Sequence, residues 1–201
     1  MGTILNNEAS VFAFPESQFE KVVVDLSDEA GSKKFVEGVV EKYGSVDAAI
    51  LTVGGFAMGN ISATSTADIM RQYKLNFETA YNIIRPVFVQ MMKQNTGRIF
   101  MIGAKPGLDA KLSKGMVAYG LAKSLILRLA ELMNDEAKGT NVVITVVVPG
   151  TIDTMVNRKA MPDADFSKWV NAEDIANIIH YHSTDAAAAL KEPVLKVYSN
   201  S

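Results

Sequence analysis

Cysteine is absent from this chain of 201 residues, and histidine occurs only twice, as His180 and His182. The absence of cysteine excludes disulfides, thiolate catalysis and cysteine-based metal sites, and it fits a reducing compartment. An alternating histidine pair could bind a metal, but the polar end of a helix is the interpretation that we favour. We therefore predict no metal site.

Long apolar runs and a surplus of positive charge are also missing. No run approaches the roughly 18 apolar residues of a membrane-spanning helix. The segment from Met1 to Pro15 has neither the basic nor the apolar region of a signal peptide. The formal net charge is −2, so no basic stripe is available to meet a nucleic-acid backbone. These features predict a cytoplasmic protein that binds neither nucleic acid nor membrane.

What the chain does contain is a series of apolar strands that alternate with helical patterns. The predicted strands cover residues 22–24, 48–53, 98–102, 142–148 and 194–198, and a further candidate lies at 10–14. The predicted helices cover about 28–42, 67–94, 115–137 and 172–180, and Gly97 is expected to end the second. Nearly continuous apolar strands are typical of a parallel sheet buried on both faces. The sequence thus predicts one α/β domain over residues 1–201 with a doubly wound parallel sheet.

The segment Met116–Ser124 has the clearest chemical meaning. It is predicted to begin a helix, so Tyr119 and Lys123 lie one turn apart on the same face. A free phenol has a pKa of about 10, and a neighbouring ammonium group stabilises the phenolate. Tyr119 is therefore a candidate proton donor to a substrate oxygen or nitrogen. The spacing alone also occurs by chance in many helices.

The ends of the predicted strands supply further candidate ligands. In a parallel α/β sheet, ligands bind beyond the carboxyl ends of the strands. Those ends are Asp25, Gly54-Gly55-Phe56, Gly103-Ala104 and Pro149-Gly150-Thr151. Glycine lets a ligand approach the backbone closely, so we expect a binding site along this edge of the sheet.

At these positions the chain resembles the short-chain dehydrogenase/reductase family over most of its length. The residues that carry the resemblance are Asp25, Thr52-Val53-Gly54, Asn76, Tyr119, Lys123 and Pro149-Gly150-Thr151-Ile152-Asp153-Thr154. The resemblance implies a Rossmann-like fold and an oxidoreductase that depends on NAD(H) or NADP(H), with NADH slightly favoured.

Within that family, the chain is most similar to the dihydropteridine reductases. The similarity lies in Gly54-Gly55-Phe56-Ala57, Gly59-Asn60, Gly103-Ala104-Lys105, Leu108-Asp109 and the irregular stretch from Asp153 to Ser167. It implies hydride transfer from nicotinamide to a pteridine, or to another small carbonyl or imine compound.

The resemblance also implies a role for each site residue. Tyr119 would protonate the substrate, and Lys123 would hold the nicotinamide ribose and lower the pKa of Tyr119. Asn76 would hold a water molecule that links Lys123 to solvent. The implied cofactor-binding residues are Asp25, Leu26, Gly54, Gly55, Phe56, Gly103, Ala104, Tyr119, Lys123, Pro149, Gly150, Thr151, Ile152 and Asn157.

The chain departs from the family pattern in two places. Ala104 stands where the family usually has a catalytic serine, and Ser113 is too far along the loop to replace it. That loss matters less for a quinonoid dihydropterin, which is already electrophilic, than for a carbonyl. The N-terminal glycine-rich turn that lays the pyrophosphate on a helix N-terminus is not found. We therefore expect a shortened domain without the first βαβ unit, in which cofactor binding is weakened.

Without that unit, the strand that ends at Asp25 has no neighbour in the usual strand order. Buried strand edges without partners are costly. Three explanations are open: the sequence is incomplete at its N-terminus, Ser10–Phe14 fills part of the gap in a natural short form, or another chain supplies the pairing.

Two alternative functions also stay open. The chain could be a non-catalytic relative that serves as a binding or assembly module, or a general carbonyl or alcohol dehydrogenase. Apolar residues surround much of both long helices, for example at Leu125, Leu129 and Leu132. This pattern predicts a homodimer or homotetramer that forms through these helices.

Overall fold

The computed structural model describes residues 1–4 and 18–199, so the candidate strand at 10–14 lies outside the described residues. The strands are β1 (Gly2–Ile4), β2 (Lys21–Val23), β3 (Ala48–Leu51), β4 (Thr96–Ile102), β5 (Asn141–Pro149), β6 (Ile152–Asp153), β7 (Val170–Asn171) and β8 (Val194–Val197). The α-helices are α1 (Glu29–Tyr43), α2 (Thr66–Tyr73), α3 (Thr79–Gln94), α4 (Lys105–Leu108), α5 (Val117–Glu136), α6 (Met155–Ala160) and α7 (Ala172–His182). Five short turns join them: η1 (Ile61–Ala63), η2 (Lys74–Glu78), η3 (Ala110–Ser113), η4 (Phe166–Lys168) and η5 (Asp185–Ala187).

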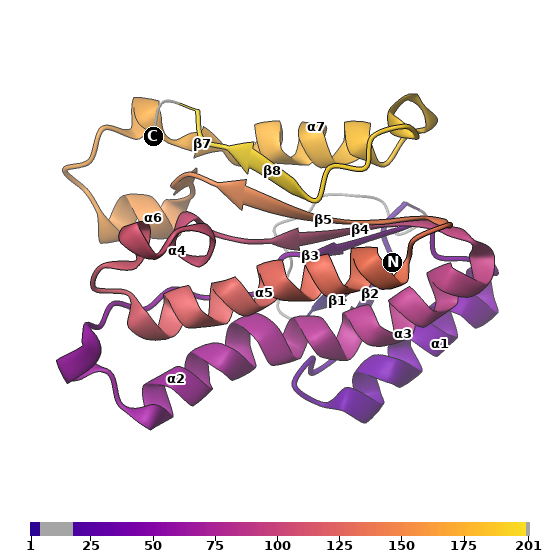
Figure 1. Cartoon of the computed structure of the whole chain (residues 1–201), viewed down its shortest axis with the longest axis horizontal. Coiled ribbons are helices and arrows are strands. Elements are labelled where there is room, and N and C mark those ends of the chain that lie inside the picture. The colour runs from indigo at the N-terminus through magenta and orange to yellow at the C-terminus, as the bar shows by residue number, and fades with distance from the viewer. Residues whose placement is uncertain (5–17, 200–201) are drawn as a thin grey trace.

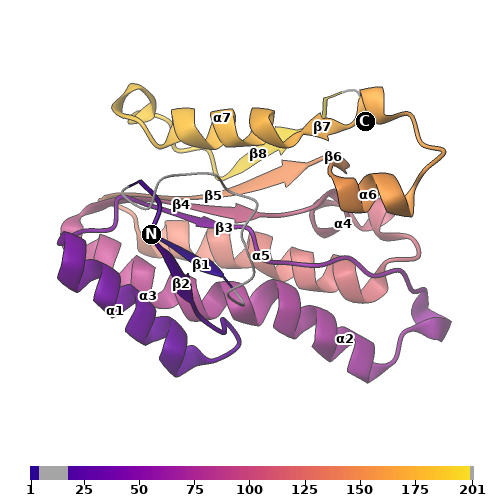
Figure 2. The same cartoon turned by 180° about the vertical axis from the view of Figure 1, so that it is seen from behind.

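Helices cover both faces of a parallel sheet with the order β3-β4-β5-β8 (Figure 1). α7 lies on one face, and α1, α3 and α5 lie on the other (Figure 2). The register aligns Ala48 with Arg98, Ile99 with Ile144, and Val146 with Val194. The prediction of a doubly wound parallel α/β fold is thus confirmed.

The two faces of the sheet carry separate apolar cores. The larger core joins β4 and β5 to α3 and α5, with Met91, Ile99 and Ile144 completely buried. The smaller core lies under α7, where Phe100 and Val147 pack against Ile175. Side chains alternate between the two cores along each strand, as the pleat of a strand requires.

The predicted helix over 67–94 is one continuous helical segment with a wide turn in its middle. α2 passes into the π-helix η2 and then into α3, which tolerates Pro86 in its interior. The helix ends at Gln94 as predicted, and Asn95 closes its C-terminus in the left-handed conformation (φ 59°). The prediction that Gly97 ends the helix is wrong. Gly97 lies in β4, where a Cβ would come within 2.3 Å of Met91 Sδ.

Capping residues set the ends of α1 and α7. Asp28 caps α1 by accepting a hydrogen bond from the Ala30 N–H, and Gly44 ends that helix with φ 81°. Asn171 caps α7 in the same way, through the Glu173 N–H. These ends match the prediction, although α7 extends to His182.

The strand that ends before Asp25 has a neighbour within the chain. β2 pairs in parallel with β1, and the Gly2 N–H donates to the Glu20 carbonyl at 2.8 Å. The expectation that this strand has no neighbour is therefore wrong, because Gly2–Ile4 of the same chain pairs with it. A strand of three residues at the N-terminus is too short to show a hydrophobic period, and for this reason the sequence pattern did not reveal it.

Within residues 1–4 and 18–199, no helix is long and apolar enough to cross a membrane. The same residues contain no group of three or more histidine and acidic side chains placed to hold a metal ion.

Candidate active site

Tyr119 and Lys123 lie in the first turns of α5, on one face as predicted. Lys123 is only 5% exposed, and its Nζ donates to the Ile102 carbonyl at 2.9 Å. Nζ lies 5.9 Å from the centre of the Tyr119 ring. Gly107 of α4 packs directly on the Lys123 backbone, since a Cβ there would come within 2.6 Å of the Lys123 carbonyl carbon. The end of β4 and α4 thus hold Lys123 beside Tyr119.

Burial controls the titration of both groups. It raises the pKa of Tyr119 to about 12 and lowers the pKa of Lys123 to about 8, because buried surroundings disfavour each charged form. The prediction that Lys123 lowers the pKa of Tyr119 is therefore wrong for this structure. Tyr119 stays a protonated phenol at neutral pH, which is the form that a proton donor needs.

Asn76 lies in the π turn η2 and is only 1% exposed. Its Nδ2 donates to the Gly55 carbonyl at 3.0 Å, and the Gly55 N–H donates to its Oδ1 at 3.1 Å. A Cβ on Gly54 would lie 2.7 Å from Asn76 Oδ1 and 3.2 Å from Lys123 Nζ. Asn76 therefore fixes the turn after β3 next to Lys123. π turns of this kind are frequent at functional sites.

Three further polar residues share the buried face with Asn76, and the sequence analysis missed them. Gln72, Thr79 and Asn82 are 5%, 8% and 7% exposed. Gln72 Oε1 accepts from Asn76 Nδ2 at 2.9 Å, and Asn82 Nδ2 donates to the Leu26 carbonyl at 2.9 Å. Polar residues at helical spacing on an otherwise apolar face were the available signal. They tie the carboxyl ends of β2 and β3 to the long helix.

The glycines at the strand ends are explained by packing within the chain. A Cβ on Gly55 would come within 2.5 Å of Leu75 Cδ2. A Cβ on Gly103 would come within 2.6 Å of Val146 Cγ1. Close contact with the chain's own side chains therefore accounts for both residues, and their role in cofactor binding stays a prediction.

Phe56 forms an apolar wall of the site beside Tyr119. The two ring centres are 5.1 Å apart in an edge-to-face arrangement, while Phe56 itself is 60% exposed. The loop that follows is fastened to the start of α5. The Gly59 N–H donates to the Gly115 carbonyl at 2.7 Å, and the Val117 N–H donates to the Gly59 carbonyl at 2.9 Å.

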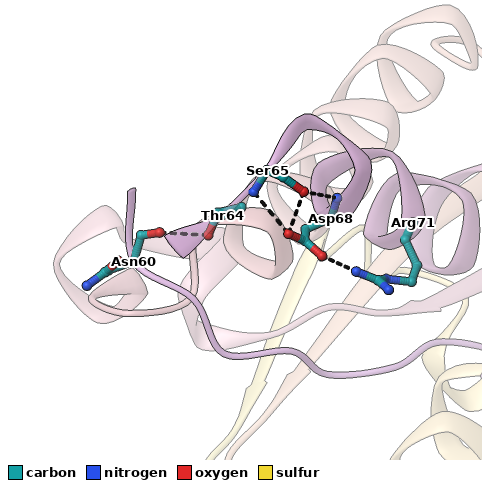
Figure 3. Close-up of polar contacts among 5 residues, drawn as sticks. All are labelled: Asn60, Thr64, Ser65, Asp68 and Arg71. Atoms are coloured by element: carbon teal, nitrogen blue, oxygen red, sulfur yellow. Dashed lines mark hydrogen bonds and ion pairs between the residues drawn. The ribbon is translucent and has the colours of Figure 1, made fainter. Parts of the chain in front are cut away.

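The same loop ends in a polar cluster that begins α2 (Figure 3). The Ser65 N–H donates to Asp68 Oδ2 at 2.9 Å, and the Asp68 N–H donates to Ser65 Oγ at 3.2 Å. This reciprocal pair is a capping box. Arg71 pairs with the other oxygen of Asp68, and Thr64 Oγ1 donates to the Asn60 carbonyl at 2.7 Å. The loop from Phe56 to Ser65 is therefore anchored at both ends.

Asp25 and Leu26 lie at the far end of the same edge, beside a cavity of about 730 Å³. Thr3, Val53 and Met70 also line it. The Asp25 carboxylate accepts hydrogen bonds from the Ser27 N–H at 2.9 Å and the Ser27 hydroxyl at 2.7 Å. These bonds hold the pKa of Asp25 below its usual value. The structure thus brings Asp25 and Leu26 to the end of β3.

The segment after β5 is anchored to the neighbouring strands. The Gly150 N–H donates to the Val197 carbonyl at 2.8 Å, and Thr151 accepts from the Val170 N–H at 2.8 Å. Ile152 packs into the smaller core under α7. Asn157 Nδ2 donates to the Ile152 carbonyl at 2.8 Å. The amide of Asn157 is therefore bound within the chain, and its contact with a cofactor stays a prediction.

Ala104 is 8% exposed and offers no hydroxyl at the end of β4. Ser113 does not replace it, because its hydroxyl donates to the Pro106 carbonyl and lies against Gly120. Among the described residues at this site, Tyr119 and Lys123 are the ionisable groups with strongly shifted pKa values. Proton transfer by a phenol near a buried amine is the chemistry that this arrangement supports.

Comparison with known proteins identifies the family of this chain. A family model described as short chain dehydrogenase matches residues 6–165. The chain belongs to the short-chain dehydrogenase family. Its members are oxidoreductases that depend on NAD(P).

Individual relatives are distant. The uncharacterized oxidoreductase YvrD of Bacillus subtilis is 24% identical, over 86% of this chain and 73% of its own length. The dihydropteridine reductase of Dictyostelium discoideum is 27% identical, over 80% of this chain and 69% of its own length. A short-chain dehydrogenase/reductase structure from Burkholderia xenovorans is 26% identical with a TM-score of 0.78, over 89% of this chain and 72% of that chain.

The residues present fit a nicotinamide dinucleotide in part. Near Tyr119, the site offers the buried Lys123 amine, the Tyr119 phenol and the apolar Phe56 ring. The far end offers a cavity with apolar side chains that suits a flat ring. Between them, no described helix begins with a glycine-rich turn whose N–H groups could receive a pyrophosphate.

Proposed function

We propose that the chain is a nicotinamide-dependent reductase of the dihydropteridine reductase type, with Tyr119 as the proton donor. A bound nicotinamide would supply the hydride. The observation that carries the proposal is the pair of half-buried Tyr119 and buried Lys123, held beside the Gly54 turn, with Ala104 in place of a hydroxyl.

The pKa values support a donor rather than a base. A phenol with a pKa of about 12 keeps its proton until the substrate develops negative charge during reduction. The buried Lys123 amine, with a pKa of about 8, can return a proton to the phenol after turnover. Lys123 would release its bond to Ile102 and hold the nicotinamide ribose.

The missing hydroxyl favours an electrophilic substrate. In a carbonyl reductase, a second donor stabilises the developing oxyanion, and removal of one such donor typically costs about 10²–10³-fold in rate. A quinonoid dihydropterin is already electrophilic, so a single donor is sufficient. The 27% identity to a dihydropteridine reductase supports the same substrate class. NADH is slightly favoured as the coenzyme.

A matched pair of variants tests the proposal. With quinonoid dihydropterin and NADH, Tyr119→Phe should lower turnover by about 10²–10⁴-fold, while NADH binding is retained. Tyr181→Phe is the control, because Tyr181 is 50% exposed on α7 and distant from this chemistry. Turnover that survives Tyr119→Phe, or a panel in which simple ketones are reduced faster than the dihydropterin, would contradict the assignment.

A non-catalytic binding module is the second candidate. The observation that favours it is that no described helix begins with a glycine-rich turn able to receive a pyrophosphate. A folded chain that reduces no substrate in the panel would support this candidate. We also propose a cytoplasmic homodimer or homotetramer, with Leu121, Leu125 and Leu132 of α5, each at least 39% exposed, in the interface.

A further inference from the structure

The irregular stretch from Asp153 to Ser167 lies in a loop whose two ends meet. β6 and β7 pair in parallel, with Ile152 opposite Val170 and Asp153 opposite Asn171. Residues 154–169 therefore leave this two-stranded sheet and return to it. Compact loops with adjacent ends are packed by their own side chains and are frequently functional.

A row of four side chains braces the interior of this loop. Arg158 donates to both carboxylate oxygens of Asp153, from Nε at 2.6 Å and from Nη2 at 2.7 Å. The Arg158 guanidinium lies 4.8 Å from the centre of the Phe166 ring, and the centre of that ring lies 4.7 Å from that of Trp169. A guanidinium that pairs with both oxygens and lies over a ring is fixed in position and in orientation. α6 is thereby joined to β6 on one side and to η4 on the other.

The geometry of this ion pair indicates positioning rather than stability. The side chains of Arg158 and Asp153 are 47% and 28% exposed. The hydrogen bonds from Arg158 hold the pKa of the Asp153 carboxyl below its usual value, so the pair is charged at neutral pH. Ion pairs that are reached by solvent contribute little to the free energy of unfolding. What the pair does fix is the place of α6.

The loop begins beside the Tyr119 site. β5 precedes it and pairs with β4, where the Gly103 N–H donates to the Val147 carbonyl at 2.8 Å. The carbonyl of Ile102, the residue before Gly103, accepts the hydrogen bond from Lys123. In Figure 1, α6, α4 and the first turns of α5 lie at the same end of the sheet. α6 is therefore a neighbour of the site, across the end of β5.

α6 exposes two large apolar side chains at this end of the sheet. Met155 and Val156 are 70% and 76% exposed. Phe56, which follows β3 on the other side of β4, is 60% exposed. Apolar side chains thus flank the end of β4 from both sides. Exposed apolar side chains around a few polar groups are typical of a ligand site, and a flat aromatic ligand would bury them.

We propose that Arg158 is a positioning residue that holds α6 in place for the substrate. Met155 and Val156 of α6 then form an apolar wall for the ring of a dihydropterin. Arg158 acts through α6 and does not itself contact the ring. This inference rests on the proposed function and adds a basis for specificity, because a small ketone would bury much less of the wall than a bicyclic ring.

Steady-state kinetics with NADH and quinonoid dihydropterin test the wall and its support. Met155→Ala removes part of the wall, and Arg158→Met removes the support. Each should raise the KM for the dihydropterin about tenfold. The kcat and the KM for NADH should change less than about threefold, because the lost binding is the same in the ground state and the transition state.

Two further variants make the kinetic test specific. Arg158→Lys should behave like Arg158→Met, because an ammonium group cannot pair through a planar fork of two N–H groups. Arg85→Met is the control. It also removes an exposed ion pair, between Arg85 of α3 and Glu29 of α1, and should leave both KM values unchanged.

Fluorescence separates the wall from its support. Trp169 is the only tryptophan of the chain, and it packs against Phe166. Without NADH, Arg158→Met should raise the acrylamide quenching constant of Trp169 about twofold, because the loop around it opens more often. Met155→Ala should leave the quenching constant unchanged.

Three results would overturn the proposal. The first is a KM for the dihydropterin that Arg158→Met or Met155→Ala leaves unchanged. The second is quenching of Trp169 that Arg158→Met leaves unchanged. The third is a joint loss of kcat, NADH binding and thermal stability in Arg158→Met, which would show that Arg158 supports the fold as a whole.

Failure of this proposal is distinguishable from failure of the proposed function. If only the positioning role is wrong, the parent chain still reduces the dihydropterin. A parent chain that reduces no dihydropterin would refute the proposed function and the role of Arg158 in it. The quenching of Trp169 would then still show whether Arg158 holds the loop.

Discussion

The two ends of the sheet edge differ in how completely the chain encloses them. Around Tyr119, three elements converge. α5 carries Tyr119 and Lys123, and the Ile102 carbonyl of β4 accepts a hydrogen bond from Lys123. Asn76 of η2 fixes the turn after β3 by hydrogen bonding to Gly55. Around Asp25, the described residues form a two-stranded sheet that is not paired with β3, and Val23 and Ile50 are about half exposed. The first end has the order that proton transfer requires. The second leaves apolar side chains about half exposed beside a cavity.

The largest stability difference is expected between two residues that face each other across β3 and β4. Phe100→Ala should lower the free energy of unfolding by about 3–5 kcal/mol, because it empties the core under α7. Ile50→Ala should cost about 1 kcal/mol or less, because half of that side chain is already exposed. Urea denaturation of both variants measures the contrast. Equal costs would mean that Ile50 is covered and that the two ends are alike.

The second prediction concerns the pH dependence of stability at the Tyr119 end. The pKa of Lys123 is lowered to about 8 in the folded chain, against roughly 10.4 in an unfolded one. Between these values the unfolded state binds more protons, so stability rises with pH across this window. The total gain is roughly 3 kcal/mol. Below pH 10, the raised pKa of Tyr119 contributes little.

Denaturation at pH 7 and pH 9.5 checks this prediction with two variants. Lys123→Met should be more stable than the parent at pH 7 and should lose most of the rise. Lys34→Met removes an exposed lysine of α1 and should keep the rise. A parent chain whose stability is flat over this range would refute the burial of a neutral Lys123.

The third prediction concerns the hydrogen bonds by which Asn76 holds the turn after β3. Asn76→Ala removes hydrogen bonds to both the N–H and the carbonyl of Gly55 and leaves them without partners. It should cost about 2–3 kcal/mol. Asn177→Ala, at an exposed position of α7, should change stability by about 0.5 kcal/mol or less. A similar small effect of Asn76→Ala would show that the turn is held by other contacts.

Sequence patterns predicted the fold well because its long elements have strong periodicity. The apolar runs of β4 and β5, and the Tyr119–Lys123 spacing on α5, depend on local sequence and were predicted correctly. The partner of β2 was missed, since three residues carry no period. The pKa of Tyr119 was predicted in the wrong direction. Spacing reveals a neighbouring charge, whereas the extent of burial, which decides the pKa here, depends on tertiary packing.

The contacts that individual residues make were harder to predict than the elements in which they lie. Gly54 and Gly55 were expected to admit a ligand, but their close neighbours are Asn76 and Leu75 of the chain itself. Asn157 was expected to reach outward, but its amide binds the Ile152 carbonyl. Such roles depend on contacts between segments far apart in the sequence, which no local pattern encodes.

The most direct test of the central claim, that this chain holds a nicotinamide coenzyme beside Tyr119, is a fluorescence titration of the full chain with NADH. We predict saturable binding that added NAD⁺ displaces and that Tyr119→Phe leaves intact. A chain that unfolds cooperatively on heating, yet shows no binding up to millimolar NADH, would contradict the account.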